Sequence, residues 1–162
     1  MNARDLTFLF DLNRIVFREN AAGLTHEESL RAPAGGGNCL NWVLGHVLAT
    51  RHAILKTLGR DGWWPAETVD LYKRGSRTLA GDEPGLVRWE TLVEEFQTSH
   101  ARVAEAITAA SEHDLAQPGG RGPGGVELHV AHRTAFLQFH EAYHIGQIGL
   151  LRRMAGHERA IG

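Results

Sequence analysis

The sequence has little of several features that would assign it to a familiar class of protein. It contains a single cysteine, Cys39, so the chain has no pair of cysteines for an internal disulfide. One free cysteine suits a reducing compartment, and we therefore expect the protein in the cytoplasm. No run of about 18 apolar residues is present, which argues against a helix that spans a membrane. The short apolar run near the N-terminus has charged residues on both sides, so a signal peptide is not expected.

An excess of charge of one sign is also missing. The chain has 17 basic and 19 acidic residues, a formal net charge of −2, and the basic residues form no cluster. Because phosphate groups are bound by clustered Lys and Arg, we do not expect nucleic acid as a partner. The hydrophobic share is 43% and the charged share 22%, which is ordinary for a globular protein. The length predicts one domain over residues 1–162.

The sequence has no persistent alternation of apolar and polar residues, so no sheet of consequence is predicted. Apolar residues instead recur at helical spacing in four segments. We predict an all-α, up-and-down four-helix bundle with helices over about 4–22, 39–58, 86–110 and 126–155, Asn38 being the N-cap of the second. The connection between the second and third helices, residues 59–85, is long. Long loops in compact domains are often functional, so a lid or a wall of a substrate site is expected there.

The ten histidines carry most of the information in the sequence, and the strongest local pattern is His140-Glu141-Ala142-Tyr143-His144. Two residues four apart on a helix differ by about 40° in direction and by roughly 6 Å in height, so both imidazoles face the same way. The stripe that they share continues through Phe136, Gln147 and Leu151, which indicates that it faces inward. Buried imidazoles need partners for their nitrogens, and a metal ion is such a partner.

The same five residues match the HExxH motif of zincin metalloproteases, in which the glutamate is the general base. The extended form of that motif needs glycine and histidine where Gln147 and Leu150 stand, and the sheet of a zincin is not predicted. A zincin-type protease is therefore not expected. Glu141 remains the candidate catalytic residue, as a general base or as a partner of a ligand. A structural carboxylate is the alternative.

A third ligand for the metal is expected upstream, from the second helix. His46 lies in the middle of that helix on a stripe that is otherwise apolar or small, so it points into the bundle. Cys39 is on the same stripe but roughly 10 Å away, too far to join the same ion. Bundles build metal sites from inward side chains of facing helices. From spacing alone, three buried histidines with hydrogen-bond partners are an equally good interpretation.

Two segments of the chain resemble the DinB-like superfamily of four-helix-bundle metalloproteins. One is NWVLGHVLATRHAIL and the other is FHEAYHIGQIGLLR. The family pattern is a histidine preceded by glycine in the second helix, then His-xxx-His near the end of the fourth, followed by a small residue and Gln; the matching residues are Gly45, His46, His140, His144, Gly146 and Gln147. The family often has arginine after the second histidine of the pair, where this chain has Ile145. That departure affects none of the three ligands.

The resemblance implies one divalent metal ion, of the zinc, nickel or iron type, on His46, His140 and His144, with coordination positions left open. Characterised members include bacillithiol S-transferases and mycothiol-dependent maleylpyruvate isomerase, in which the metal activates a thiolate. The expectation is therefore a metal-dependent enzyme that carries out thiol transfer or isomerisation on a small molecule, with a low-molecular-weight thiol as partner. The alternative is a noncatalytic metal-binding, structural or sensor protein.

Other polar residues have weaker assignments. Gln147 is expected to orient a ligand or to cap a buried network, and His100 and Asn13 to form hydrogen bonds in the core. Tyr72, Arg74 and Arg77 form either a clamp for an anionic substrate or part of an ordinary solvated loop. We expect the remaining histidines at the surface or in interfaces: His26, His52, His113, His129, His132 and His157.

The back of the fourth helix, opposite the histidines, is almost free of charge. Small residues there indicate close approach of another helix; they are Ala131, Ala135, Ala142, Ile145, Gly146 and Gly149. A helix that is apolar on all sides is buried on all sides, which is more than one bundle requires. The sequence therefore predicts a homodimer through this face.

Overall fold

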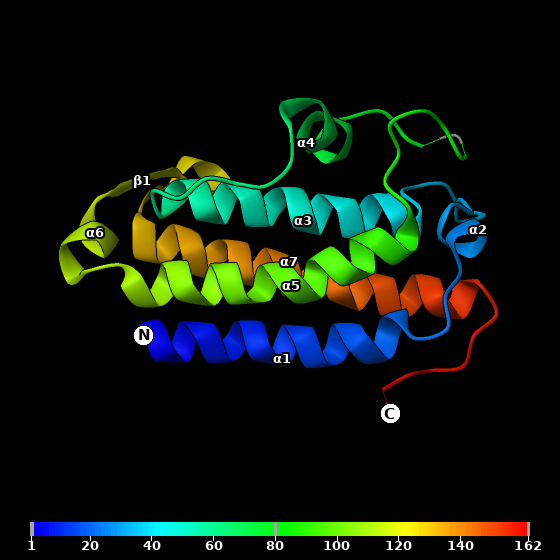
Figure 1. Cartoon of the computed structure of the whole chain (residues 1–162), viewed down its shortest axis with the longest axis horizontal. Helices are drawn as coiled ribbons and strands as arrows, with labels where there is room; N and C mark the ends of the chain where they lie inside the picture. The colour runs from blue at the N-terminus through cyan, green and yellow to red at the C-terminus, as the bar shows by residue number, and fades with distance from the viewer. Residues whose placement is uncertain (1, 80, 162) are drawn as a thin grey trace.

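The computed structural model describes residues 2–79 and 81–161, and it confirms an all-α bundle (Figure 1). Residues 1, 80 and 162 of the predicted domain lie outside the described residues. Four long helices form the bundle: α1 (Ala3–Ala21), α3 (Leu40–Thr57), α5 (Trp89–Ala109) and α7 (Val130–Met154). The connections contain the short helices α2 (His26–Ser29), α4 (Ala66–Tyr72) and α6 (Glu112–Ala116). The strands β1 (Pro118–Arg121) and β2 (Glu127–His129) form a small antiparallel hairpin around a 3₁₀ turn, Pro123–Gly125.

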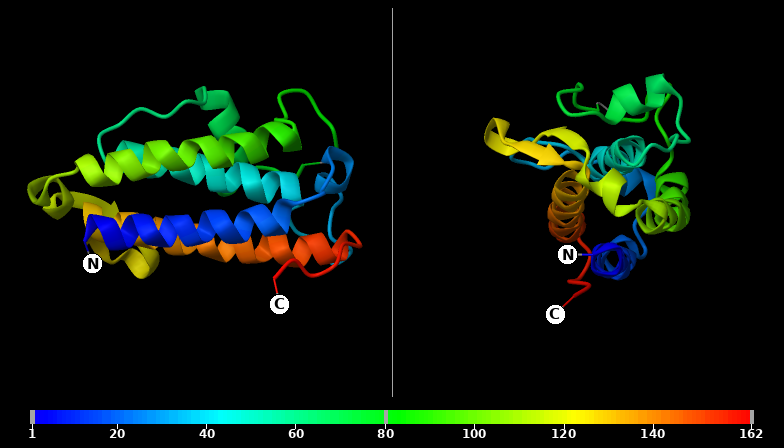
Figure 2. Two further views of the ribbon diagram at one scale, coloured as in Figure 1. Left: turned by 60° about the horizontal axis from the view of Figure 1, so that its bottom comes forward. Right: turned by 90° about the vertical axis from the view of Figure 1, so that its left-hand side faces the viewer.

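The four long helices do not alternate strictly in direction. Helices α1 and α7 run one way and α3 and α5 the other, as the colour gradient shows in Figure 1. Viewed along the bundle, the helices stand at the corners of a square in which α7 neighbours α1 and α3 (Figure 2). The long connection between α3 and α5 makes this order possible, because it returns along the outside of the bundle before α5 begins.

The N-terminus of α3 differs by one residue from the prediction. Cys39, and not Asn38, is the N-cap: its backbone is extended, and its carbonyl oxygen accepts the first helical hydrogen bond from the N–H of Val43 at 3.0 Å. Asn38 precedes the cap and lines a cavity. The predicted rule that a short polar side chain caps the helix holds instead for α1, where Asn2 and Asp5 form a capping box.

The core consists of two apolar clusters that are separated by a layer of polar side chains. One cluster contains Phe17, Leu48, Phe96 and Ile145, and the other contains Phe10, Ile54, Val103 and Leu137. On each long helix a buried polar residue lies between the two clusters; these residues are Asn13, Arg51, Ser99 and Glu141. A polar layer fixes how far each helix can slide along the others, because any shift would leave these groups without partners.

The connection over residues 59–85 packs against α3. His52 is 3% exposed, packs against the ring of Trp63 and accepts a hydrogen bond from the backbone N–H of Trp64 at 3.2 Å. Farther along, the ring of Tyr72 is fully buried against Gly45, where an added Cβ would lie 2.1 Å from the ring. Gly45 therefore permits the contact that brings the end of α4 onto α3.

The surroundings of α7 account for part of its small and apolar character. Helix α1 lies along one side of it, with Asn20 donating to the carbonyl of Ile145 at 3.1 Å, and a Cβ added at Gly149 would meet the amide of Asn20 at 2.9 Å. Part of the face predicted for a homodimer is thus covered within the chain. Of the described helices, none is long and apolar enough to cross a membrane.

Candidate metal centre

Three histidines from two helices come together on one side of the bundle. His46 projects from the middle of α3, and His140 and His144 project from neighbouring turns of α7. The Nε2 atom of His140 lies 3.3 Å from that of His46 and 3.1 Å from that of His144. A ligand atom from each of the three lies within 4.8 Å of the others. The structure therefore brings together all three residues that the sequence predicted as ligands.

Hydrogen bonds on the outer side of two of the rings set their tautomers. The Nδ1–H of His46 donates to the backbone carbonyl of Tyr72 at 2.7 Å, and a carbonyl oxygen can only accept. The Nδ1–H of His144 donates to Oε1 of Gln147 at 2.7 Å, while the amide of Gln147 donates to the hydroxyl of Tyr143 at 3.3 Å. In both rings Nε2 is then unprotonated and directs its lone pair toward the other histidines, which is the form that binds metals.

His140 stands between the other two histidines and has the poorest set of partners. Among the residues that the structure describes, its buried Nδ1 has no hydrogen-bond partner. Burial and the nearby charges of His144, His46 and Arg74 lower the pKa of His140 to about 4. Burial likewise lowers the pKa values of His46 and His144, against the opposing effects of the Tyr72 carbonyl and of Gln147. All three imidazoles are therefore neutral at neutral pH and available as ligands.

The spacing of the three Nε2 atoms suits a single ion. Two nitrogens bound to one zinc ion at about 2.0–2.1 Å in tetrahedral geometry lie roughly 3.3 Å apart. The two measured separations, 3.3 and 3.1 Å, are close to that value. Without an ion, a single proton on Nε2 of His140 satisfies only one of the other two nitrogens, so one lone pair in this partly buried site lacks a partner, which is unfavourable. The donor set fits a divalent metal.

The site opens into a cavity of about 490 Å³ between α3, α7 and the preceding loops. The three histidines line the cavity, as does the loop with Gly36, Gly37 and Asn38. Its apolar wall includes Trp42, whose ring stacks on that of His46 with centroids 4.7 Å apart, together with Val43, Leu150 and Leu151. Arg74, from the connection after α4, also lines it. The expectation that this connection supplies a wall of the site agrees with the position of Arg74.

Comparisons with known proteins agree with this arrangement. The model of the DinB superfamily matches residues 9–148. The chain belongs to the DinB superfamily. A conserved protein from Enterococcus faecalis has a similar structure, with a TM-score of 0.72 and 16% sequence identity over 96% of this chain and 98% of that one. At that identity the likeness concerns the fold alone. No curated protein matches the sequence.

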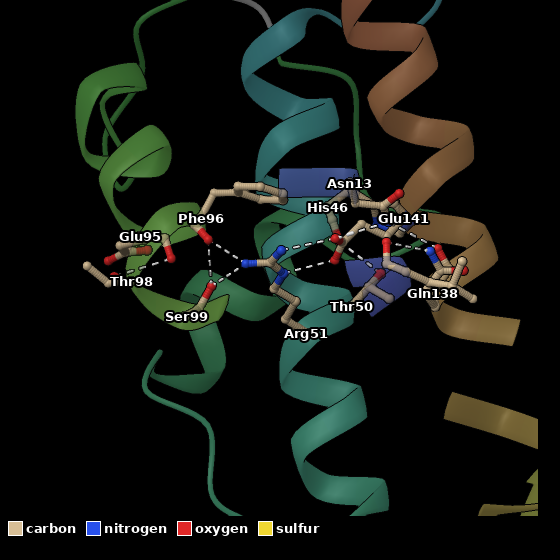
Figure 3. A network of polar contacts seen from close by, with 11 residues as sticks. Asn13, His46, Thr50, Arg51, Glu95, Phe96, Thr98, Ser99, Gln138 and Glu141 are labelled. Atoms are coloured by element: carbon tan, nitrogen blue, oxygen red, sulfur yellow. Dashed lines mark hydrogen bonds and ion pairs between the residues drawn. The ribbon is translucent and has the colours of Figure 1, made fainter. Parts of the chain in front are cut away.

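In this DinB-superfamily chain, Glu141 lies about 100° round α7 from His140 and inside the polar layer of the core (Figure 3). Its carboxylate is fully buried and accepts from Arg51 at 2.9 and 3.0 Å and from the amide of Asn13 at 3.3 Å. Arg51 in turn donates to the carbonyl of Phe96 and to the hydroxyl of Ser99 at 2.8 Å. The catalytic role of Glu141 stays a prediction, and these contacts support a positioning role.

Several weaker assignments are resolved by the structure. Asn13 forms core hydrogen bonds as expected, and His100 pairs with Asp11 at 2.9 Å. Of the two alternatives for Tyr72, Arg74 and Arg77, an anion clamp and a solvated loop, neither describes Tyr72. Tyr72 is buried, donates to Asn41 and accepts from the N–H of Val87, and Arg77 is engaged by Glu83. Arg74 alone of the three lines the cavity.

The prediction of surface positions is wrong for two of the six remaining histidines. His52 is buried against the two tryptophans, and His26 is 7% exposed, with its Nδ1 accepting from the N–H of Trp89 at 3.2 Å. In each case the imidazole accepts a hydrogen bond from the backbone N–H of another segment. The donor to His52 is Trp64, in the connection between α3 and α5, and the donor to His26 is Trp89, the first residue of α5. The other four are exposed or partly exposed: His113, His129, His132 and His157.

No role was predicted from the sequence for Arg51, for the carbonyl of Tyr72 or for the ring of Trp42. A signal for Arg51 was present, because it is the one arginine in a helix rich in apolar residues, and the structure shows it fully buried. The carbonyl of Tyr72 has no such signal, since a backbone group carries no residue-type information. The position of this carbonyl depends on Gly45, because the ring of Tyr72 packs where a side chain at Gly45 would be. Gly45 is the glycine that precedes the histidine in the family pattern.

Proposed function

We propose that His46, His140 and His144 bind one divalent metal ion of the zinc, nickel or iron type. The observation that carries this proposal is the convergence of three Nε2 atoms whose outer nitrogens are, in two of the rings, already committed to acceptors. Imidazole suits each of these metals. Family membership and the chemistry of the donor set point the same way.

We further propose that the site is catalytic and acts on a small molecule, by thiol transfer or by isomerisation with a low-molecular-weight thiol. Three protein ligands beside an open cavity are typical of catalytic metal sites, whereas structural sites have four protein ligands. Among the described residues, the metal-ligating group contains these three histidines and no carboxylate or cysteine. A bound metal would lower the pKa of a thiol or water in the open position.

The chain's own residues have definable parts in such a site. The Tyr72 carbonyl and Gln147 hold His46 and His144 in the tautomers that bind metal. Trp42 and Leu151 exclude water from one side of the cavity. Glu141, paired with Arg51, fixes the turn of α7 that carries both ligands. The single buried cysteine supports a cytoplasmic location, and the lack of a basic cluster supports a small molecule over nucleic acid as the partner.

Elemental analysis of the purified protein tests the first proposal. We expect about one divalent ion per chain, and little or none after His46→Ala. His132→Ala is the matched control, since His132 is exposed on α7 and outside the cluster. Full metal occupancy in the His46→Ala protein would overturn the assignment.

Turnover tests the second proposal. The metal-loaded protein is assayed with a panel of low-molecular-weight thiols and an electrophilic acceptor, beside the His46→Ala protein. Metal-dependent consumption of one thiol is the expected result. Inactivity with the whole panel, together with a bound metal, would favour the noncatalytic alternative of a structural or sensor site.

A further inference from the structure

The cavity beside the three histidines has an uneven distribution of charge. Among the described residues that line it, none is acidic, and one, Arg74, is a permanent cation. Three neutral imidazoles would leave the full double charge of a divalent ion in place, because no ligand carboxylate offsets it. The cavity with its ion is therefore strongly positive. A neutral molecule in the cavity would leave this positive charge uncompensated, whereas an anion would compensate it.

Arg74 is distinguished from its neighbours by its contacts. In the part of the chain that the structure describes, Lys73 pairs with Asp70 at 2.9 Å and Arg77 with Glu83, whereas no carboxylate lies within ion-pair distance of Arg74. Arg74 lines the same cavity as His46 and His140. The guanidinium thus stands at the cavity, near the ligands and with hydrogen-bond donors available.

The remaining lining indicates the shape of the molecule that fits. The lining includes apolar side chains, namely Trp42, Val43, Leu150 and Leu151, and the polar groups of Tyr143 and Asn38. A volume of about 490 Å³ suits a metabolite-sized ligand and is too small for a folded partner. An arginine recognises a planar anion such as a carboxylate through two parallel hydrogen bonds.

We infer that the substrate of this site is a small organic acid whose carboxylate is bound by Arg74 while its reactive end faces His46, His140 and His144. This assignment of substrate class rests on the proposed metal site. Arg74 is then a specificity-determining residue, and the apolar wall receives the carbon skeleton between the two ends. Neutral analogues of the same length bind without the contribution of Arg74.

A pair of matched probes tests the inference. Protein loaded with Co²⁺ is titrated with 3-mercaptopropionate, which carries a carboxylate, and with 3-mercapto-1-propanol, which carries a neutral hydroxyl at the same distance. The Co²⁺ absorption bands report thiolate binding without any turnover. We expect the acid to bind about ten- to a hundredfold more tightly, the range for a charge-assisted hydrogen bond. Arg74→Gln is expected to abolish that preference and to leave binding of the alcohol nearly unchanged.

Lys73→Gln is the matched control, because it removes one positive charge from the adjacent, exposed position outside the cavity. It is expected to retain the preference, which separates direct recognition from a general effect of charge. Equal affinity of the wild-type protein for both probes, or an unchanged preference in Arg74→Gln, would overturn the inference and leave the metal site standing. Failure of the wild-type protein to take up Co²⁺ would instead remove the metal site and this inference together.

Discussion

The guanidinium of Arg51 and the carboxylate of Glu141 form a two-point ion pair, with Nε to Oε2 at 2.9 Å and Nη2 to Oε1 at 3.0 Å, and both side chains are fully buried. Glu141 directly follows His140 in the chain, so the pair fixes the rotation and height of α7 relative to α3. Those two quantities decide whether His140 and His144 meet His46. The same register of α7 against α3 therefore forms both the polar layer of the core and the metal centre.

Removing one member of this pair is expected to be costly. Arg51→Met leaves the carboxylate of Glu141 buried without its cation, and we expect a loss of about 3–5 kcal/mol in the free energy of unfolding, measured in urea. Replacing both residues by apolar ones of similar size, as in Arg51→Met with Glu141→Leu, should recover much of that loss. Arg31→Met, at an exposed ion pair with Glu27, is the control and should change stability by less than about 1 kcal/mol. Equal effects of Arg51→Met and Arg31→Met would contradict this account.

The helices and the ligand stripe were predictable from the sequence because they depend on local periodicity. Apolar spacing placed each long helix to within about four residues, and the i, i+4 spacing of His140 and His144 required that both face one way. The partners of these residues were not predictable in the same way. Arg51 and Glu141 are 90 residues apart, and nothing in their local pattern indicates that they pair. The missed N-cap at Cys39 is a one-residue error of the kind that local rules leave open.

Gln147 is expected to affect metal affinity more than stability. Its Oε1 accepts from the Nδ1–H of His144 at 2.7 Å and holds that ring in the tautomer that binds metal. Gln147→Leu removes this acceptor, and loss of such a partner typically lowers metal affinity about 10- to 100-fold. The measurement is a competition titration of Zn²⁺ against a chelator of known affinity. Gln97→Leu on α5, away from the site, is the control, and a similar loss of affinity there would count against a specific role of Gln147.

Two glycines of the same bundle should respond in opposite directions to alanine. A Cβ at Gly45 would lie 2.1 Å from the ring of Tyr72, so Gly45→Ala must displace that ring and the carbonyl that orients His46. We expect a loss of about 1–3 kcal/mol in stability together with weaker metal binding. Gly146→Ala, in an exposed helical position with nothing within 4 Å of the new Cβ, should stabilise by roughly 0.5–1 kcal/mol. Thermal unfolding of both variants checks the sign, and stabilisation by Gly45→Ala would refute the packing argument.

Stability should fall in mild acid because of His52. Burial first, and then the charges of Lys56 and Arg102, lower its pKa to about 4 in the folded chain, against about 6.5 when unfolded. As the pH falls, the unfolded chain therefore binds the proton first, so this contribution is complete above about 6.5 and is lost as the pH falls toward about 4. His52→Gln keeps an acceptor for the N–H of Trp64 but does not titrate. Urea unfolding of the metal-free proteins at several pH values gives the free energy of unfolding as a function of pH. That free energy should fall less steeply with falling pH in the variant, and an identical pH dependence would exclude this role.

The predicted homodimer acquires a more specific surface from the structure. Because α1 covers part of the small-residue face of α7, the surface left for a second copy is the outer side of these two helices. Large apolar side chains are exposed on both helices outside the cavity: Phe8, Leu12 and Ile15 on α1, and Phe139 and Met154 on α7. A twofold axis would bury this surface against its own copy. Phe139→Glu is expected to convert a two-chain mass in light scattering to that of one chain, whereas Val126→Glu, at an equally exposed position beside the hairpin, should not. A one-chain mass for the wild-type protein would contradict the homodimer.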